Sequence, residues 1–189
     1  DVKRGDIGST MAGYAQAYLS DDAPTAADAI TVSPYLGYGS LTPALNLAEA
    51  NGRGVFILAL TSNPEGVGVQ HAVNGDQAVA AGIVEGVTAS NAQASGEGRL
   101  GSIGLVIGAT VGGAVSDLGI DLQRANGPLL APGVGAQGAG PAELEAVFGT
   151  ARRQVLASTS RGVLKAGPSI DELRKAASAS AYEAAAALR

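Results

Sequence analysis

Residues 55–60 read Val-Phe-Ile-Leu-Ala-Leu, a continuous apolar run with the length of one β-strand. A second run of this kind, Ile-Gly-Leu-Val-Ile, spans residues 103–107. Runs that are apolar at every position are typical of parallel strands that are covered on both faces. Shorter apolar runs occupy residues 29–32, 128–131 and 155–158. The sequence therefore predicts a parallel β-sheet built from these runs.

Helical patterns separate the apolar runs, with Pro in the first turn of two of them and Gly after their ends. Helices are predicted over residues 9–19, 42–51, 70–94, 141–148 and 169–189. Strands and helices that alternate in this way indicate βαβ units and an α/β fold.

The first six residues have the character of a strand end, so the chain holds six strand–helix units. A closed (β/α)8 barrel needs eight strands and typically about 250 residues. We therefore expect residues 1–189 to form a single TIM-barrel domain that is N-terminally incomplete. About two units of roughly 30 residues each are expected to be absent.

Composition excludes several classes of function. Lys and Arg number 12 and Asp and Glu number 17, which gives a net charge of −5 and argues against binding to nucleic acid. The absence of Cys and the single His exclude disulfides, thiol nucleophiles and multi-histidine metal sites. The uncharged run at residues 100–116 carries five glycines and is too short for a membrane span. A soluble, cytoplasmic protein with no membrane partner is predicted.

Charged side chains are concentrated at the start of the chain, in the pattern Asp1-x-Lys3-x-x-Asp6. On a strand, residues 1 and 3 point to the same face, which sets a carboxylate beside an ammonium group. Asp6 follows the strand end, at the rim where barrel enzymes keep their active sites. A lysine held between carboxylates stays protonated and can donate a proton. The alternative is a solvated cluster of charges at the chain start.

A glycine-rich segment, Gly133–Gly138, matches G-x-G-x-x-G between a predicted strand and a predicted helix. One interpretation is a dinucleotide-binding turn, which requires an acid at the end of the next strand, where residues 157–161 contain none. A second is a loop whose backbone N–H groups bind a phosphate monoester. A third is a plain connection rich in Gly.

Arg161 follows the last predicted strand, directly after the glycine-rich segment in strand order. A guanidinium at a strand end can bind an anion through two parallel hydrogen bonds. Barrel enzymes commonly bind phosphate with the loops after strands 7 and 8. If two strands precede this chain, both features fall on those loops. The alternative is a surface arginine.

These residues resemble a known family. The matching segments occur in one order along the chain: Asp1-x-Lys3-x-x-Asp6-Ile7-Gly8-Ser9-Thr10, Thr31-Val32-Ser33-Pro34-Tyr35-Leu36-Gly37, Leu60-Thr61-Ser62-Asn63-Pro64-Glu65-Gly66, Pro132-Gly133-Val134-Gly135-Ala136-Gln137-Gly138 and Ser160-Arg161. Together they resemble the orotidine 5'-phosphate decarboxylase family, and most of all its bacterial subgroup with mycobacterial and actinobacterial members. The similarity runs along essentially the whole chain.

The resemblance implies a carboxy-lyase that decarboxylates orotidine 5'-phosphate to UMP, the last step of pyrimidine synthesis, without metal or cofactor. It implies a homodimer with active sites at the interface. Lys3 would protonate C6 of the pyrimidine, and Asp1 would lie against the substrate carboxylate and hold Lys3. Asp6 would reach into the partner's site, with Thr10 beside it at the ribose.

The resemblance also implies residues that bind the rest of the nucleotide. Ser62 would bind the pyrimidine edge. Gln137 and Arg161, with backbone N–H groups near Gly135 and Gly162, would hold the phosphate.

The chain departs from the family pattern in two places. The family has a ribose-binding Asp at the end of strand 1 and a second active-site Lys at the end of strand 2, and neither position has a counterpart here. Two alternatives therefore remain open. One is a magnesium-dependent sibling barrel of the ketogulonate-phosphate decarboxylase or hexulose-phosphate synthase type. The other is a catalytically inactive fragment that binds a nucleotide.

Overall fold

A parallel sheet of five strands, in the order β1-β2-β5-β6-β7, forms the centre of the molecule. The computed structural model describes residues 1–134 and 139–188. The strands are β1 (Ala29–Val32), β2 (Gly54–Leu60), β5 (Ile103–Ile107), β6 (Leu129–Pro132) and β7 (Val155–Ser158). Each apolar run that was predicted as a strand is confirmed, with boundaries that differ by no more than a residue or so.

The start of the chain pairs with the outer edge of β1. Arg4 forms a parallel bridge with Val32. The Lys3 amide donates to the Thr31 carbonyl at 2.7 Å, and the Ser33 amide donates to the Arg4 carbonyl at 2.7 Å. A Cβ atom on Gly5 would lie 2.1 Å from the Ser33 carbonyl oxygen, so only glycine permits this approach. The predicted strand end at the N-terminus is confirmed only as this single bridge at Arg4, because the residues on either side of it are not in a strand.

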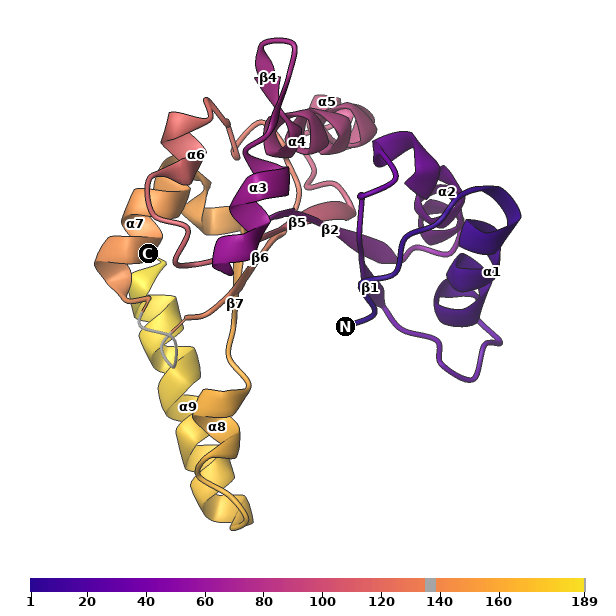
Figure 1. The fold of residues 1–189 in the computed structure, drawn as a ribbon. Coiled ribbons are helices and arrows are strands. Elements are labelled where there is room, and N and C mark those ends of the chain that lie inside the picture. The colour runs from indigo at the N-terminus through magenta and orange to yellow at the C-terminus, as the bar shows by residue number, and fades with distance from the viewer. Residues whose placement is uncertain (135–138, 189) are drawn as a thin grey trace.

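The remaining elements connect the strands (Figure 1). They are α1 (Gly8–Leu19), η1 (Tyr38–Leu41), α2 (Thr42–Ala50), η2 (Pro64–Gly66), α3 (Val67–Gln70), β3 (Val73–Asn74), β4 (Gln77–Ala78), α4 (Val79–Ser90), α5 (Ala92–Gly96), α6 (Ala114–Asp117), α7 (Pro141–Phe148), η3 (Gly149–Gln154), α8 (Arg161–Leu164) and α9 (Ile170–Ala187). In the described part of the chain, no helix has the length and apolar character needed to cross a membrane.

The order of the strands in the sheet follows their order in the sequence, without reversal. A dinucleotide-binding sheet is wound in two directions from a switch point, which this order lacks, so that interpretation of the glycine-rich segment is wrong. Right-handed crossovers in one direction place the helices on one side of the sheet. Figure 1 shows the helices in an arc around the strands, as in part of a barrel wall. Within the described residues the two edges of the sheet are not paired with each other.

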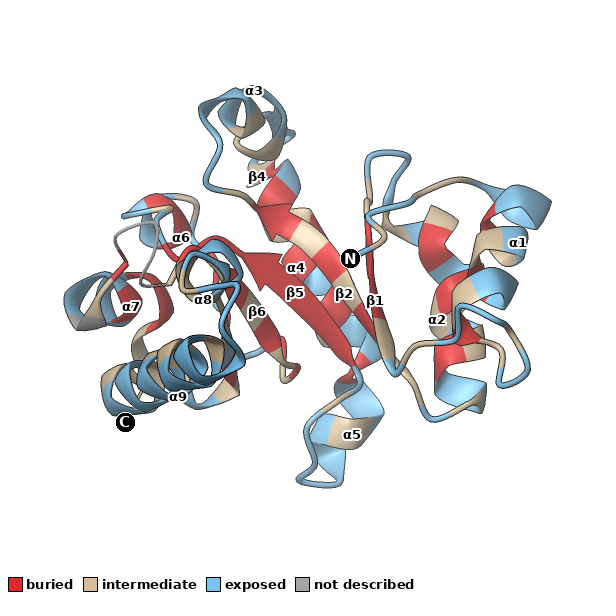
Figure 2. Ribbon diagram, turned by 90° about the horizontal axis from the view of Figure 1, so that it is seen from below, coloured by how far each residue is buried: buried red, intermediate tan, exposed pale blue. Residues whose placement is uncertain are grey.

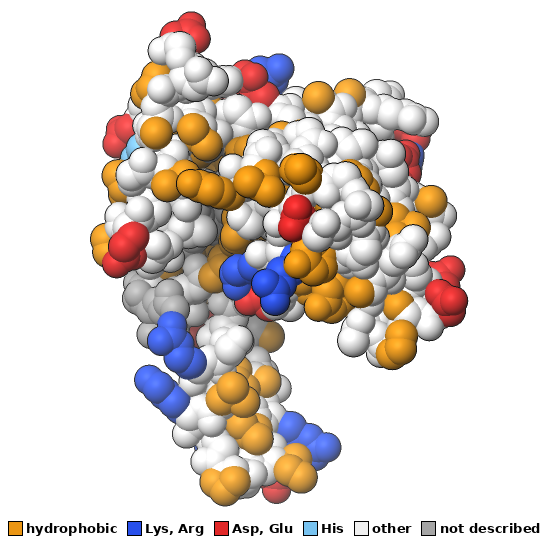
Figure 3. Space-filling view, turned by 45° about the vertical axis from the view of Figure 1, so that its right-hand side comes forward, with side chains coloured by type: hydrophobic (Ala, Val, Ile, Leu, Met, Phe, Trp, Pro, Cys, Tyr) orange, Lys and Arg blue, Asp and Glu red, His pale blue; other side chains and the backbone are white. Residues whose placement is uncertain are grey.

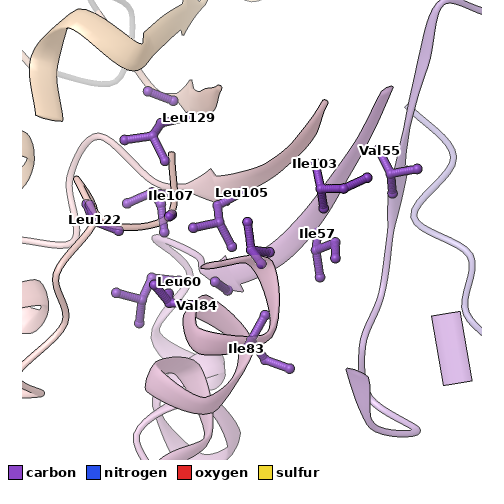
Figure 4. Packing of buried hydrophobic residues seen from close by; sticks show 14 of the residues in the cluster. Val55, Ile57, Leu60, Ile83, Val84, Ile103, Leu105, Ile107, Leu122 and Leu129 are labelled. Atoms are coloured by element: carbon purple, nitrogen blue, oxygen red, sulfur yellow. The ribbon is translucent and has the colours of Figure 1, made fainter. Parts of the chain in front are cut away.

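The core lies between the sheet and this arc of helices (Figure 2). Figure 4 shows Ile57, Leu60, Leu105 and Ile107 on the side of the sheet toward α4, which carries Val84, and all five are buried. The β5 strand is buried at every position, as its composition predicts. Alternate residues of β2, by contrast, are only half-buried. The prediction that both faces are covered therefore holds for β5 and holds only in part for β2.

The helix predicted over residues 70–94 is wrong in its first part. A short antiparallel hairpin pairs Val73 with Ala78 and Asn74 with Gln77, and α4 begins only at Val79. Gly75 and Asp76 form the two-residue turn between Asn74 and Gln77, with Gly75 at φ +69°. Glycine at the first position of a two-residue hairpin turn favours this conformation, and it is the signal that the helical pattern hid.

Asn91 ties the amino-terminal ends of the strands together. It is 2% exposed, and its Nδ2 donates to the carbonyls of Ile103 and Ala125 at 2.8 Å each. Its Oδ1 accepts the Ile103 amide at 3.3 Å. A Cβ on Gly101 would lie 2.1 Å from this oxygen, so the site fits tightly around the amide.

Asn91→Ala is expected to lower the free energy of unfolding by about 2–4 kcal/mol, because it leaves buried backbone groups without partners. Chemical denaturation measures the change. The control is Asn46→Ala on the exposed face of α2, which should change stability by less than about 0.5 kcal/mol. An equal effect of the two substitutions would contradict the role given to Asn91.

Candidate functional site

The first cluster of polar side chains lies where the N-terminal segment meets β1. Lys3 Nζ forms an ion pair with Asp1 Oδ2, which is the contact that the sequence predicts, although residues 1–3 do not form a regular strand. The Thr31 hydroxyl donates to Asp1 Oδ1 at 2.8 Å. The Lys3 and Asp1 side chains are 49% and 64% exposed, so a ligand can reach both.

The backbone at Lys3 departs from strand geometry. Its φ is +49°, in the left-handed region that side-chain-bearing residues rarely adopt. Such conformations cluster at functional sites, where surrounding contacts hold them in place. Here the Lys3 amide donates to both the carbonyl and the hydroxyl oxygen of Thr31.

Asp6 and Thr10 lie just beyond this pair. Asp6 Oδ1 accepts the Ile7 amide at 2.8 Å, and Thr10 is exposed in the first turn of α1. Among the ion pairs of the described residues, none joins Asp6 to Lys3. The expectation from the sequence that Lys3 is held between two carboxylates is therefore not met within one chain. The role that the family resemblance implies for Asp6, in the active site of a partner subunit, stays a prediction.

The second cluster lies at the ends of β6 and β7. A small cleft of about 140 Å³ opens there, and it is lined by Pro132, Gly133, Val134, Ser158, Thr159, Ser160 and Arg161. The fold thus brings Arg161, the first residue of α8, beside the start of the glycine-rich segment, as predicted. Gly162 follows it and is half-buried. Gly135 and Gln137 lie outside the described residues.

The third cluster is the loop after β2, which carries the exposed Ser62. The Gln70 side chain clamps the loop, because its Oε1 accepts the Thr61 amide at 2.9 Å and its Nε2 donates to the Thr61 hydroxyl at 2.6 Å. A Cβ on Gly108, after β5, would lie 2.9 Å from Ser62 Oγ. Ser62 is therefore seated against the end of the neighbouring strand.

The clamp continues along the loop through Asn63. The Thr61 hydroxyl lies 2.7 Å from Asn63 Oδ1, and Asn63 Nδ2 donates to Glu65 Oε2 at 3.1 Å. This hydrogen bond lowers the pKa of the exposed Glu65 carboxyl, because it favours the charged form.

The three clusters share the carboxyl-terminal edge of the sheet. The Asp1–Lys3 pair lies beside β1 and the Arg161 cleft lies beside β7, so they stand at opposite ends of the strand order. Figure 3 shows Lys and Arg side chains in the middle of one face and along the stem formed by α8 and α9, with a hollow between them. Among the described residues, no group of three or more His, Asp or Glu side chains is arranged to hold a metal ion.

Two residues of these clusters, Thr31 and Gln70, were not predicted from the sequence to belong to the site. Thr31 lies within a predicted strand, where threonine is common for packing reasons. Gln70 was assigned to the start of a helix that in fact begins at Val79. Their local sequence shows no pattern that distinguishes them, because their partners are distant or lie across a turn.

Comparison with known proteins gives a consistent result. The model of the orotidine 5'-phosphate decarboxylase / HUMPS family matches residues 1–176. The orotidine 5'-phosphate decarboxylase of Streptomyces coelicolor is 59% identical over 97% of this chain, and that of Salinispora arenicola is 55% identical over 94%. The chain spans 64% of the length of the first relative and 62% of the second.

Solved structures show the same fold. A crystal structure from Streptomyces avermitilis, assigned as an orotidine 5'-phosphate decarboxylase, matches all of this chain with a TM-score of 0.91 and 58% identity. OMP decarboxylase from Leishmania donovani matches all of it with a TM-score of 0.75 and 30% identity. The chain covers 64% and 66% of these two structures. The prediction of an α/β chain that forms part of a TIM barrel is confirmed.

Gln70→Leu is expected to raise the hydrogen-exchange rate of the Thr61 amide by about tenfold, because it removes both hydrogen bonds of the clamp. Amide exchange followed by NMR measures this rate. Gln16→Leu, on the exposed face of α1, is the control and should leave it unchanged. An unaltered Thr61 rate in Gln70→Leu would show that the clamp does not hold the loop.

Proposed function

Since the chain belongs to the orotidine 5'-phosphate decarboxylase / HUMPS family, we propose that this protein converts orotidine 5'-phosphate to UMP and carbon dioxide in pyrimidine synthesis. The observation that carries the proposal is the Asp1–Lys3 ion pair at the carboxyl-terminal edge of the sheet. The relatives from Streptomyces coelicolor and Salinispora arenicola support this choice within the family. We place the protein in the cytoplasm, with that pathway.

Lys3 carries out the chemical step. The bond between C6 and the carboxylate breaks, carbon dioxide leaves, and the electron pair stays on C6 as a vinyl carbanion. The Lys3 ammonium lies beside the developing charge, stabilises it, and gives its proton to C6, which leaves a neutral amine. Fixed charges of this kind stabilise a transition state without having to reorient during the reaction. No metal or organic cofactor takes part in the proposed step.

Asp1 has two roles in this proposal. It holds the Lys3 ammonium through the ion pair, and it lies against the substrate carboxylate. Repulsion between the two carboxylates ends when carbon dioxide leaves, so it favours the transition state over the bound substrate.

The phosphate binds at the opposite end of the strand order, in the cleft beside Arg161. The guanidinium supplies paired hydrogen bonds, and the backbone N–H of Gly162 lies at the start of α8. Gln137 and the Gly135 amide are proposed to complete this site. Ser62 binds the pyrimidine edge. Binding energy from the phosphate, far from C6, orients the ring over Lys3.

A homodimer is proposed to complete each active site. Large apolar side chains are exposed at Ile7, which follows Asp6 in the sequence, and at Tyr35 and Leu36, in the loop after β1, with exposures of 62%, 77% and 53%. Large exposed apolar side chains are a common feature of protein interfaces. Burying them against a second copy would carry Asp6 and Thr10 into the partner's site, at the ribose.

Lys3→Ala is expected to lower kcat by on the order of 10²–10⁴-fold, because it removes both the fixed charge and the proton donor. The decrease in absorbance of orotidine 5'-phosphate measures turnover, in this protein and in the Streptomyces coelicolor relative with the matching substitution. Lys175→Ala, on the exposed surface of α9, is the control and should retain full activity. A Lys3→Ala rate within a few-fold of the unmodified protein, in both, would exclude this mechanism.

The same assay separates the alternatives. Chelation of divalent cations should leave turnover unchanged, whereas a magnesium-dependent sibling barrel would lose it. Binding of UMP without any turnover would instead indicate a nucleotide-binding protein that is not an enzyme.

Mixing the Lys3→Ala and Asp6→Ala variants is expected to restore activity, because a hybrid dimer contains one site with both residues intact. For random mixing of equal amounts, we expect recovery of roughly a quarter of the normal activity, from one complete site in half of the dimers. Each variant alone serves as the control. No recovery, in mixtures shown to exchange subunits, would argue against shared sites.

A further inference from the structure

Thr31 is one of two buried polar side chains among the described residues, and it is 6% exposed. We propose that Thr31 is a positioning residue, which fixes the Asp1–Lys3 pair in the geometry that decarboxylation requires. This inference rests on the proposed function. Thr31 belongs to β1, beneath the N-terminal segment, and it acts through Asp1 and Lys3 rather than on the substrate.

The Thr31 hydroxyl uses its full hydrogen-bonding capacity on three consecutive residues. It accepts the Val2 amide at 2.9 Å and the Lys3 amide at 3.0 Å, and it donates to Asp1 Oδ1 at 2.8 Å. A hydroxyl has one donor and two acceptor lone pairs, so no capacity remains. Because both amides can only donate, the hydroxyl hydrogen must point to the carboxylate. The Asp1 carboxylate is thereby held in one orientation by a charge-assisted hydrogen bond.

The same residue holds the unusual backbone of Lys3. The Lys3 amide is shared between the Thr31 carbonyl at 2.7 Å and the Thr31 hydroxyl at 3.0 Å. A left-handed conformation at a lysine persists only where its surroundings determine it. Thr31 therefore fixes the backbone from which the Lys3 side chain extends. It also fixes the Asp1 carboxylate, with which the Lys3 ammonium pairs.

Both effects bear on the reacting atoms. The Lys3 ammonium must lie within reach of C6 when carbon dioxide leaves, and a displacement of about 1 Å in such a group can cost on the order of 100-fold in rate. A long side chain that is half exposed has many conformations of its own. The Asp1 carboxylate and the Lys3 backbone, both hydrogen-bonded to Thr31, restrict the conformations of the Lys3 side chain before the substrate binds.

Thr31→Val tests the inference, because valine keeps the shape of the side chain and removes the hydroxyl. We expect kcat to fall roughly 10–100-fold, with KM changed by less than about threefold. The Val2 amide should exchange with solvent faster, as measured by NMR. Thr31→Ser, which retains the hydroxyl, should restore most of kcat and the slow exchange. Thr88→Val is the matched control, since that hydroxyl donates only to the Val84 carbonyl in its own helix among the described residues.

The outcomes separate this inference from the proposed function. Unchanged kcat in Thr31→Val would overturn it, as would a loss that Thr31→Ser does not restore and that follows a drop in melting temperature. If the unmodified protein fails to turn over orotidine 5'-phosphate, the proposed function fails. In that case Val2 exchange decides the structural part alone: unchanged exchange in Thr31→Val overturns it, and faster exchange restored by Thr31→Ser supports it.

Discussion

The backbone pairing between the N-terminal segment and β1 is the constraint on which the site depends. Two hydrogen bonds, from Lys3 to the Thr31 carbonyl and from Ser33 to the Arg4 carbonyl, set the segment in register with β1. Because the pairing is parallel, it places the charged residues level with the carboxyl-terminal end of that strand. Gly5 makes the close approach possible, since any side chain there would collide with the Ser33 carbonyl.

The sheet then relates this charged pair to the Arg161 cleft. The five strands of this sheet run in the same direction and follow one another in sequence order, so their carboxyl ends share one edge and their connections lie outside. The Lys3 ammonium lies at the β1 end of the strand order, and the Arg161 guanidinium lies at the β7 end. A ligand with a reacting centre and a phosphate at opposite ends fits this separation better than a small symmetric anion would. The nucleotide monophosphate of the proposed function is a ligand of this kind.

Local hydrogen-bond networks give each cluster its shape. The Gln70 amide holds the loop that bears Ser62, and the Thr31 hydroxyl holds the residues that bear the ion pair. Each network satisfies polar groups that are shielded in part from water, where an unmade hydrogen bond is costly. The side chains that would contact the substrate are thus supported by polar side chains that would not.

The sequence by itself determined the strands, their parallel direction and the family, because continuous apolar runs and motifs such as Asp1-x-Lys3-x-x-Asp6 are local patterns. It also predicted the contact between Asp1 and Lys3, although Lys3 has φ +49° and the two residues do not lie in a regular strand. It misplaced the start of α4, where the hairpin turn at Gly75-Asp76 outweighed the helical pattern. Only the tertiary structure decided the roles of Thr31, Gln70 and Asn91. Their hydrogen-bond partners lie on other segments, which only the fold brings close. The chemistry of a threonine or amide side chain alone does not indicate which backbone groups it will contact.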